Sequence, residues 1–257
     1  MSALSGSACG LWVLGGTIAL LALFWLLRGR IRIDRGWAGF NIVRFSRFER
    51  LVHWLLALSF VVLALTGLGM RYRTPLLVPL LGEQGFAEVL RMHALMGIPF
   101  LASLLLAFLL WVRHSLPHWR DVVWLFKGGG MIVRGWHPPA WKFNAGQKLL
   151  FWLVITGGAW LSFSGLMLLL PHDPIPGYEA YRTAWHSVPA LVLTCAVIVH
   201  IYIRTAGVQG AASAMASGEV DANWARQHHS LWADQEMRRI EDSAEPAAGE
   251  TVASPTQ

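Results

Sequence analysis

The sequence is poor in charged residues and in cysteine. Only 14% of its 257 residues are charged, whereas 55% are hydrophobic; an ordinary soluble domain carries about 25% charged residues. This composition excludes a water-soluble globule and predicts helices that pack in lipid. The two cysteines, Cys9 and Cys195, lie far apart in the sequence, so neither a disulfide nor a thiolate metal site is expected. The C-x-x-C-H motif is absent, which excludes a covalently attached c-type haem. The sequence also contains no P-loop, dinucleotide fingerprint or internal repeat.

Apolar runs of membrane-spanning length divide the chain. Five are present, at about 11–27, 51–70, 92–112, 149–170 and 186–205. The first run precedes a cluster of arginines, which is the reverse of a cleaved signal peptide and predicts a retained anchor helix. We therefore expect four regions: a transmembrane anchor with its Arg-rich continuation (1–35), a four-helix core (36–205), a surface segment (206–240) and an acidic disordered tail (241–257).

The basic residues indicate an orientation in the membrane. They gather at and beyond the ends of the apolar runs, so the net charge of +6 reflects topology and does not indicate a nucleic-acid partner. Seven arginines fall in 28–50, six basic residues in 113–148 and four from Arg204 onwards, so 17 of the 21 Lys and Arg lie on one side. The positive-inside rule makes that side cytoplasmic. We expect a multi-pass protein of the bacterial inner membrane, with its N-terminus periplasmic and its C-terminus cytoplasmic.

Four histidines at the ends of apolar runs are the first candidate site: His53, His93, His186 and His200. A titratable group at membrane depth is a functional candidate. His186 and His200 are fourteen residues apart, which corresponds to about 21 Å of helix and an angular offset of roughly 40°. The topology pairs His53 with His200 on the inner side and His93 with His186 on the outer side. A haem with two axial ligands needs such a pair. A lone histidine at the membrane interface is usually only a polar group. Four histidines that pair by depth favour the interpretation that they are metal ligands.

Other residues near these levels allow two interpretations. Gly67, Gly69 and Gly97 would let a flat macrocycle approach a helix, although helix packing uses the same residues. Four arginines also lie near these levels: Arg47, Arg50, Arg91 and Arg204. They could pair with haem propionates, or they could be ordinary arginines of the membrane interface. The other histidines are read as loop or structural residues: His114, His118, His137, His172, His228 and His229.

The segment that opens the fourth apolar run is a second candidate site. It contains Asn144, Gly146 and Gln147 at the expected depth of the inner histidines. A quinone needs a hydrogen-bond donor, an apolar slot and protons from a nearby aqueous phase. Asn144 could equally be the N-cap of the following helix. From chemistry alone, both readings stay open.

Several stretches resemble the cytochrome b (gamma) subunit of membrane-bound respiratory formate dehydrogenase. They are Glu49-Arg50-Leu51-Val52-His53-Trp54, residues 142–148, residues 186–202, and a tail signature of Ala214-Met215, Gly218, Trp224-Ala225, His228-His229 and Trp232. The likeness covers about residues 44–235. It implies that the four histidines ligate two b haems, and that menaquinone binds beside the inner haem at Asn144 and Gly146. It further implies an iron–sulfur beta subunit with a membrane anchor and a molybdenum or tungsten catalytic alpha subunit. The first apolar run lies outside the four-helix core of the shorter family members.

We therefore predict an all-α membrane protein: a four-helix dihaem cytochrome b bundle plus one N-terminal transmembrane helix. It would anchor a formate dehydrogenase and pass electrons from the iron–sulfur subunit through the outer and inner haems to menaquinone or ubiquinone. Because protons would be taken from the cytoplasm, the cycle would build a membrane potential. Hydrogenases and sulfur-compound reductases use related anchors and remain alternatives. A membrane di-iron enzyme would need its histidines on one side, and a transporter would need broken helices with a midplane ionisable residue.

Overall fold

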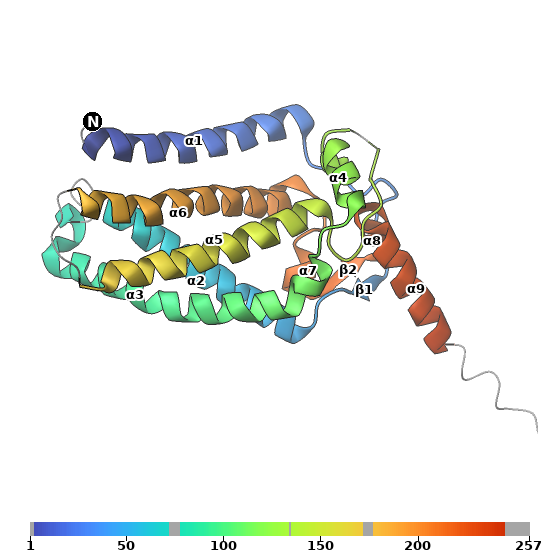
Figure 1. The fold of residues 1–257 in the computed structure, drawn as a ribbon. Coiled ribbons are helices and arrows are strands. Elements are labelled where there is room, and N and C mark those ends of the chain that lie inside the picture. The colour runs from blue at the N-terminus through green and yellow to red at the C-terminus, as the bar shows by residue number, and fades with distance from the viewer. Residues whose placement is uncertain (1–2, 72–77, 134, 172–176, 245–257) are drawn as a thin grey trace, which may run out of the picture.

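Long helices dominate the computed structural model, which describes residues 3–71, 78–133, 135–171 and 177–244 (Figure 1). These helices are α1 (Ala3–Arg28), α2 (Arg47–Arg71), α3 (Val78–Trp111), α5 (Ala145–Leu169) and α6 (Tyr178–Tyr202). Each contains a stretch that is long and apolar enough to cross a membrane, which makes five such helices in the described part of the chain. A helix satisfies its own backbone hydrogen bonds, as lipid requires. The predicted all-α membrane architecture is confirmed.

Several of these helices begin well before the apolar runs that predicted them, and two of the extensions bear on the site. Helix α3 begins at Val78 and not near residue 92, with a kink at Gly82 (φ 68°), and α6 begins at Tyr178. Backbone hydrogen bonding continues through helix-forming residues after the hydropathy has changed, so an apolar run does not mark a helix end. His93 and His186 consequently lie inside their helices and not at the ends.

The middle of the bundle is apolar and closely packed. Helix α2 packs on α3, α5 packs on α6, and α1 lies along α6 (Figure 1). A buried cluster joins the four core helices: Phe60, Phe100, Leu104, Leu161 and Leu193. Gly158 lets α5 come close to α3, because a Cβ at this position would lie 3.0 Å from a methyl carbon of Leu104.

One end of the bundle carries a cap built from short elements. The cap contains β1 (Asn41–Val43), α4 (Trp119–Phe126), α7 (Ser213–Ala216), β2 (Glu219–Asp221), α8 (Ala222–His228) and α9 (Ser230–Ala244). Three short turns accompany them: η2 (Val112–His114), η3 (Gly128–Gly130) and the π-helical η4 (Ile203–Gly207). Strands β1 and β2 form an antiparallel ribbon that the sequence analysis did not predict, with Asn41 opposite Asp221.

The segment after α1 is bound to this cap. The backbone N–H of Ile31 donates to the carbonyl of Gly207 (2.8 Å), and that of Gln209 donates back to Ile31 (2.9 Å). The Arg28 guanidinium donates to the carbonyl of Met131 (2.9 Å). Residues 28–33 are therefore part of the cap structure as well as the continuation of an anchor helix.

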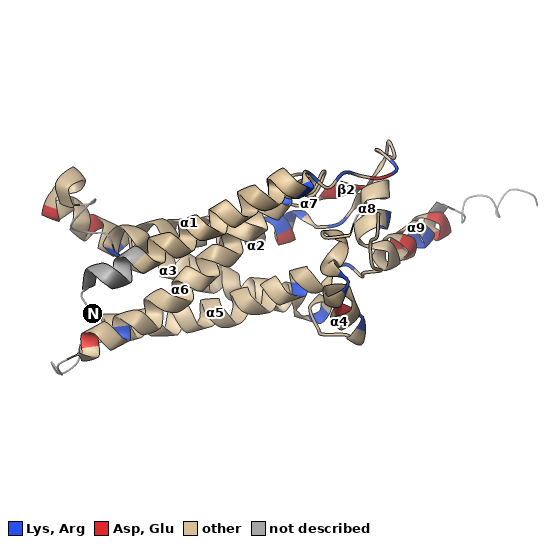
Figure 2. Ribbon diagram, turned by 90° about the horizontal axis from the view of Figure 1, so that it is seen from above, with Lys and Arg blue, Asp and Glu red and all other residues tan. Residues whose placement is uncertain are grey.

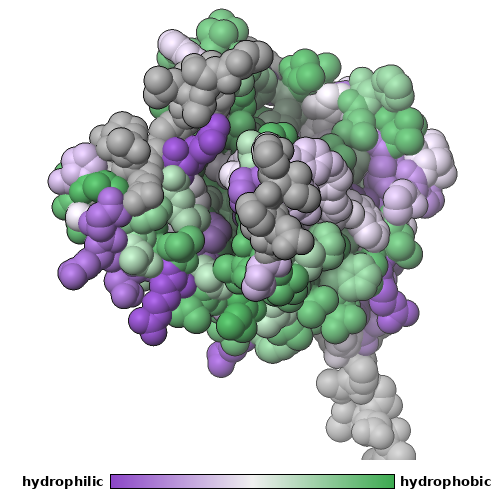
Figure 3. Space-filling view, turned by 60° about the vertical axis from the view of Figure 1, so that its left-hand side comes forward, coloured by the Kyte–Doolittle hydropathy of each residue, from purple (hydrophilic) through white to green (hydrophobic). Residues whose placement is uncertain are grey.

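Charge is distributed unevenly over the molecule. Lysine and arginine gather at the cap end, whereas the bundle is largely uncharged (Figure 2). Figure 3 brings the opposite end forward and shows hydrophobic side chains over much of the visible surface. Many large apolar side chains on the helices are exposed, including Leu58, Leu109 and Leu149. Such a surface is suited to lipid contact, and the chain is a multi-pass membrane protein.

Part of the predicted tail belongs to the cap. Residues 241–244 complete α9, and the rest of the segment predicted to be disordered, 245–257, lies outside the described residues. His172 also lies outside them.

Candidate functional site

The four predicted histidines meet as two pairs. His93 on α3 faces His186 on α6, with their ring centroids 6.2 Å apart. His53 on α2 faces His200 on α6, with centroids 6.4 Å apart. The two levels lie at either end of the apolar middle of the bundle. The partners are those that the topology predicted.

The space between the paired rings fits a haem iron. A metal–nitrogen bond of about 2.0 Å and about 1.1 Å from that nitrogen to the ring centre, counted twice, give roughly 6.2 Å between centroids. Glycines border the outer pair closely. A Cβ at Gly67 would lie 3.3 Å from Cε1 of His93, and a Cβ at Gly165 would lie 3.2 Å from Cε1 of His186. A larger residue at either position would push its imidazole away.

Hydroxyl groups orient both histidines of the outer pair. The Oγ1 of Thr66 lies 2.8 Å from Nδ1 of His93, and the Oγ of Ser164 lies 2.9 Å from Nδ1 of His186. Each hydroxyl donates its own proton to a backbone carbonyl one turn earlier, at 2.6 and 2.8 Å. The hydroxyl oxygen therefore accepts from Nδ1–H, beside a backbone hydrogen bond of His93 with Leu63 and of His186 with Leu161. This leaves Nε2 with a free lone pair for a metal. Neither hydroxyl residue was predicted from the sequence. A usable signal was present, since each directly precedes a glycine, in Thr66-Gly67 and Ser164-Gly165.

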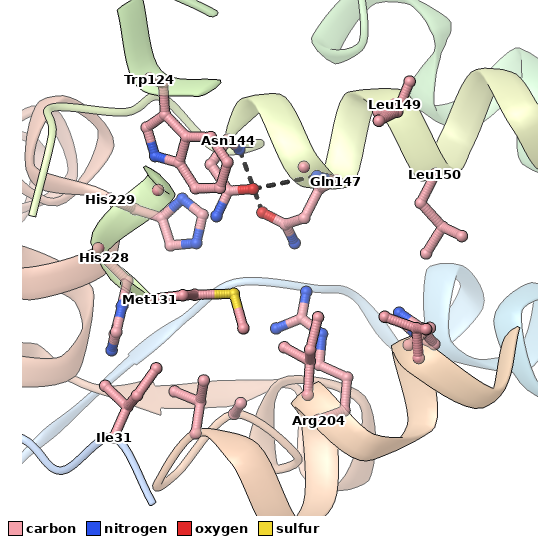
Figure 4. Close-up of a pocket in the computed structure, with 18 of the residues that line it drawn as sticks. Ile31, Trp124, Met131, Asn144, Gln147, Leu149, Leu150, Arg204, His228 and His229 are labelled. Carbon is pink, nitrogen blue, oxygen red and sulfur yellow. Dashed lines mark hydrogen bonds between the residues drawn. The ribbon is translucent and has the colours of Figure 1, made fainter. Parts of the chain in front are cut away.

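The inner pair has a different environment. Nδ1 of His53 is buried and has no hydrogen-bond partner among the described residues, and its ring packs edge-on against Trp54 at 5.3 Å. His200 lines a cavity of about 280 Å³. Arg204, one turn further along, lines the same cavity (Figure 4). The inner site thus opens onto a chamber at the cap end of the bundle.

The second predicted site forms another wall of this cavity. Asn144, Gly146 and Gln147 line it together with His200. Asn144 is the N-cap of α5: its Oδ1 accepts from the N–H of Gln147 (3.0 Å), and the Gln147 Oε1 accepts from the N–H of Asn144 (3.2 Å). Both side-chain oxygens are used by the cap, and both amide nitrogens point toward the cavity (Figure 4). The N-cap geometry therefore leaves two N–H donors for a ligand.

Two guanidinium groups influence each other at the cap end: Arg44 is buried, and the partly buried Arg204 lines the cavity beside His200. Nη2 of Arg44 donates to the carbonyl of Lys142 (2.5 Å) and contacts Nε2 of His229 (2.9 Å), whose Nδ1 donates to the carbonyl of Trp141 (2.7 Å). Burial lowers the pKa of Arg44, and the charge of Arg204 lowers it further. In the described part of the chain no carboxylate neutralises either arginine. The cavity wall is therefore electropositive.

The other predicted arginines are placed differently. Arg91 is 71% exposed and pairs with Glu88 (3.9 Å). Arg47 is exposed, and the guanidinium of Arg50 donates to the carbonyl of Ala216 (2.5 Å). Of the four arginines proposed for propionates, only Arg204 lines the cavity beside a histidine of the pairs.

Two histidines read as loop or structural residues lie next to this cavity. His228 lines it directly, and His137 packs on His228 with ring centroids 5.3 Å apart. The side chain of His137 is only 14% exposed, so its prediction as a solvated loop residue is wrong. The loop folds back onto α8, a contact that hydropathy cannot reveal.

Comparison with known proteins identifies the family. Residues 44–218 match the family described as prokaryotic cytochrome b561. The cytochrome b556(fdo) subunit of formate dehydrogenase from Escherichia coli (strain K12) is 30% identical over 209 residues, which cover 80% of this chain and 98% of that protein. The nitrate-inducible cytochrome b556(Fdn) subunit of the same organism is 27% identical over 215 residues, which cover 81% and 97%. The formate dehydrogenase cytochrome b556 subunit of Haemophilus influenzae is 30% identical over 205 residues, which cover 77% and 84%. The chain, with its two facing histidine pairs in an apolar helical bundle, belongs to the prokaryotic cytochrome b561 family and is a homologue of the cytochrome b subunits of formate dehydrogenase.

Proposed function

We propose that this chain carries electrons across the membrane between two b haems, one held by His93 and His186 and the other by His53 and His200. The observation that supports this most strongly is the separation of the facing rings, 6.2 and 6.4 Å, which suits an iron between two imidazoles. When bound, each haem supplies a one-electron redox centre. The protein's part is to hold the imidazoles, to keep the space between the two levels apolar, and to neutralise propionates. Arg204 is the guanidinium best placed to do this at the inner site.

The acceptor in this proposal is a quinone, menaquinone or ubiquinone, in the cavity beside His200. The amide nitrogens of Asn144 and Gln147 would donate to a quinone oxygen, and Gly146 would leave room for the ring. Leu149 and Leu150 along α5 give this side of the wall an apolar surface, away from the charged Arg204. Two amide donors in an apolar slot are what a quinone carbonyl requires.

The chain would work as the membrane anchor of a formate dehydrogenase complex, as the names of its relatives suggest. An iron–sulfur subunit would deliver electrons to the outer pair, and a molybdenum- or tungsten-containing subunit would oxidise formate. The basic cap faces the cytoplasm in this arrangement, with the N-terminus periplasmic. Electrons would move inward while quinone takes cytoplasmic protons, so a membrane potential would be generated.

The haem assignment is tested with the purified complex. A pyridine haemochrome measurement should give two b haems per chain. His93→Ala and His53→Ala should each remove one haem, whereas His114→Ala, at an exposed histidine, should retain both. Retention of both haems in His93→Ala and His53→Ala would overturn the assignment.

The quinone site is tested by removing its amide donors while keeping the helix cap. Gln147→Glu retains the oxygen that caps α5 and loses the amide N–H groups. It should slow the reoxidation of reduced haem by menadione by up to about tenfold, since a hydrogen bond of this kind is worth about 0.5–1.5 kcal/mol. Gln209→Glu is the matched control, because its Oε1 likewise accepts a backbone N–H, from Ile33 (3.1 Å), outside the cavity. Equal rates in the two variants would contradict the site.

A further inference from the structure

The segment that follows α1 brings an exposed carboxylate to a buried histidine. Oδ2 of Asp34 lies 3.2 Å from Nε2 of His137; the Asp34 side chain is 55% exposed and that of His137 is 14% exposed. The backbone N–H of Asp34 donates to the side chain of Gln227 (2.8 Å), which fixes the segment on α8. Asp34 lies before residue 44, where the match to the family begins. This contact is thus made by a part of the chain outside the family match.

Behind His137 lies a second, much smaller cavity. Its volume is about 10 Å³, which is about the room that one water molecule occupies. Polar side chains line it from four positions: His137, Asn144, Gln227 and His228. A water needs two to four polar partners to be stable in a protein interior. This cavity has enough polar neighbours to hold a water molecule. Asn144 and His228 also line the large cavity, so the two cavities are adjacent.

His228 stands between the two cavities. Its Nε2 is buried and has no hydrogen-bond partner among the described residues, and its ring packs on that of His137 at 5.3 Å. Burial lowers the pKa of His228 to about 3, with the charges of His137, Arg204 and Arg44 acting in the same direction. A neutral imidazole offers one N–H donor and one acceptor nitrogen. It can therefore accept a proton on one side while it releases a proton on the other.

We propose that Asp34, His137 and His228 form a proton relay from the surface of the cap to the large cavity. This inference rests on the proposed function, because its purpose is to supply quinone reduction. Reduction of a quinone to its quinol would consume two electrons, which a haem held by His53 and His200 would supply, and two protons. Each proton moves from bulk water to Asp34, then to His137, across the water-sized cavity to His228, and onto a quinone oxygen. Every relay group returns to its starting protonation state. The charged groups that act on His228 are Arg44 and Arg204, and Arg204, which lines the large cavity, would stabilise negative charge on a quinone oxygen.

The experiment measures how fast quinone reoxidises the haems. The purified complex, with its haems reduced by stoichiometric dithionite, is mixed with menadione in a stopped-flow instrument between pH 5.5 and 8.5. His228→Ala and His137→Ala should slow reoxidation about tenfold or more at the alkaline end, since positioned proton donors contribute about 10²–10⁴-fold and water replaces them in part. Asp34→Asn should slow it about threefold, because its position is open to water. The slowing should grow with pH, and added imidazole should restore the rate.

Matched controls separate the relay from general damage. His118→Asn changes another histidine of the same loop region while keeping a side chain that can accept the Arg120 N–H, and Asp242→Asn changes an exposed carboxylate on α9. Both should reoxidise at the wild-type rate. Relay variants that keep complete haem spectra and the wild-type rate at every pH would overturn the relay. A slowing that neither depends on pH nor responds to imidazole would also overturn it. Failure of the wild-type complex to reoxidise with menadione would instead refute quinone reduction itself, and the relay with it.

Discussion

Removing the hydroxyl groups behind the outer histidine pair should change the redox potential of one haem only. Thr66→Val keeps the shape of the side chain and removes the acceptor 2.8 Å from Nδ1 of His93. Ser164→Ala does the same for His186, where the distance is 2.9 Å. A hydrogen bond from Nδ1–H raises the basicity of an imidazole ligand, and a more basic ligand favours the ferric state. Loss of this hydrogen bond should therefore raise the midpoint potential of the haem held by His93 and His186.

The magnitude follows from the strength of each bond. Both distances are those of ordinary hydrogen bonds, each worth about 1 kcal/mol. For a one-electron couple about 1.4 kcal/mol corresponds to 59 mV, so each substitution should raise the potential by up to about 40 mV and the pair together by up to about 80 mV. The inner haem, whose histidines have no such hydroxyl in the described structure, should keep its potential.

A spectroelectrochemical titration of the b-haem bands measures both potentials. Thr194→Val and Ser162→Ala are matched controls, because these hydroxyls donate to backbone carbonyls at 2.7 and 2.9 Å and make no hydrogen bond to a histidine in the described structure. A downward shift, an equal shift of both haems, or the same shift in the controls would refute the orienting role.

Three further outcomes are expected. Gly165→Leu should displace His186, whose Cε1 would lie 3.2 Å from the new Cβ, and remove one of two haems from the haemochrome spectrum; two retained haems would contradict this. Gly158→Val should destabilise the bundle by about 1–3 kcal/mol through overpacking, seen as a lower thermal midpoint, whereas Gly15→Val, with nothing within 4 Å of its Cβ, should not. Burial lowers the pKa of His228 to about 3. Between that pH and about 6.5, His228 is therefore protonated in the unfolded chain and neutral in the folded chain. Stability should therefore be insensitive to this group above pH 6.5 and fall by about 1.4 kcal/mol per pH unit between pH 6.5 and 3. Thermal unfolding at pH 7.5 and 5 should show a smaller loss in His228→Gln than in the wild type, and equal losses would rule out this contribution.

Much of the bundle could be predicted because its signals are local in the sequence. A helix in lipid must be apolar over about 20 residues, so hydropathy locates all five spans. A fixed rise per residue relates His186 to His200 along one helix, and the alternation of basic loops indicates which histidines share a depth. The glycine of the tail signature, by contrast, is explained by a contact between distant parts of the chain. Gly218 has a φ of +92°, and a Cβ there would lie 2.6 Å from the carbonyl oxygen of Phe45, so this close turn requires glycine.

The sequence by itself determined the membrane class and the five spans, because lipid and helix geometry impose these on residues close together in the chain. It also predicted the pairing of the histidines, because the alternation of basic loops assigns each helix end to one side of the membrane. Only the tertiary structure decided how the sites are completed. The hydroxyl of Thr66 reaches His93 from another helix, the cap of α5 turns the amide nitrogens of Asn144 and Gln147 toward the cavity, and residues 34, 137 and 228 come together at the cap. The helix cap is a local contact, but Thr66 and His93 are 27 residues apart and Asp34 and His137 are 103 residues apart. The first contact depends on how α2 packs on α3, and the second on how the N-terminal segment closes the cap, and neither arrangement can be read from a periodicity in the sequence.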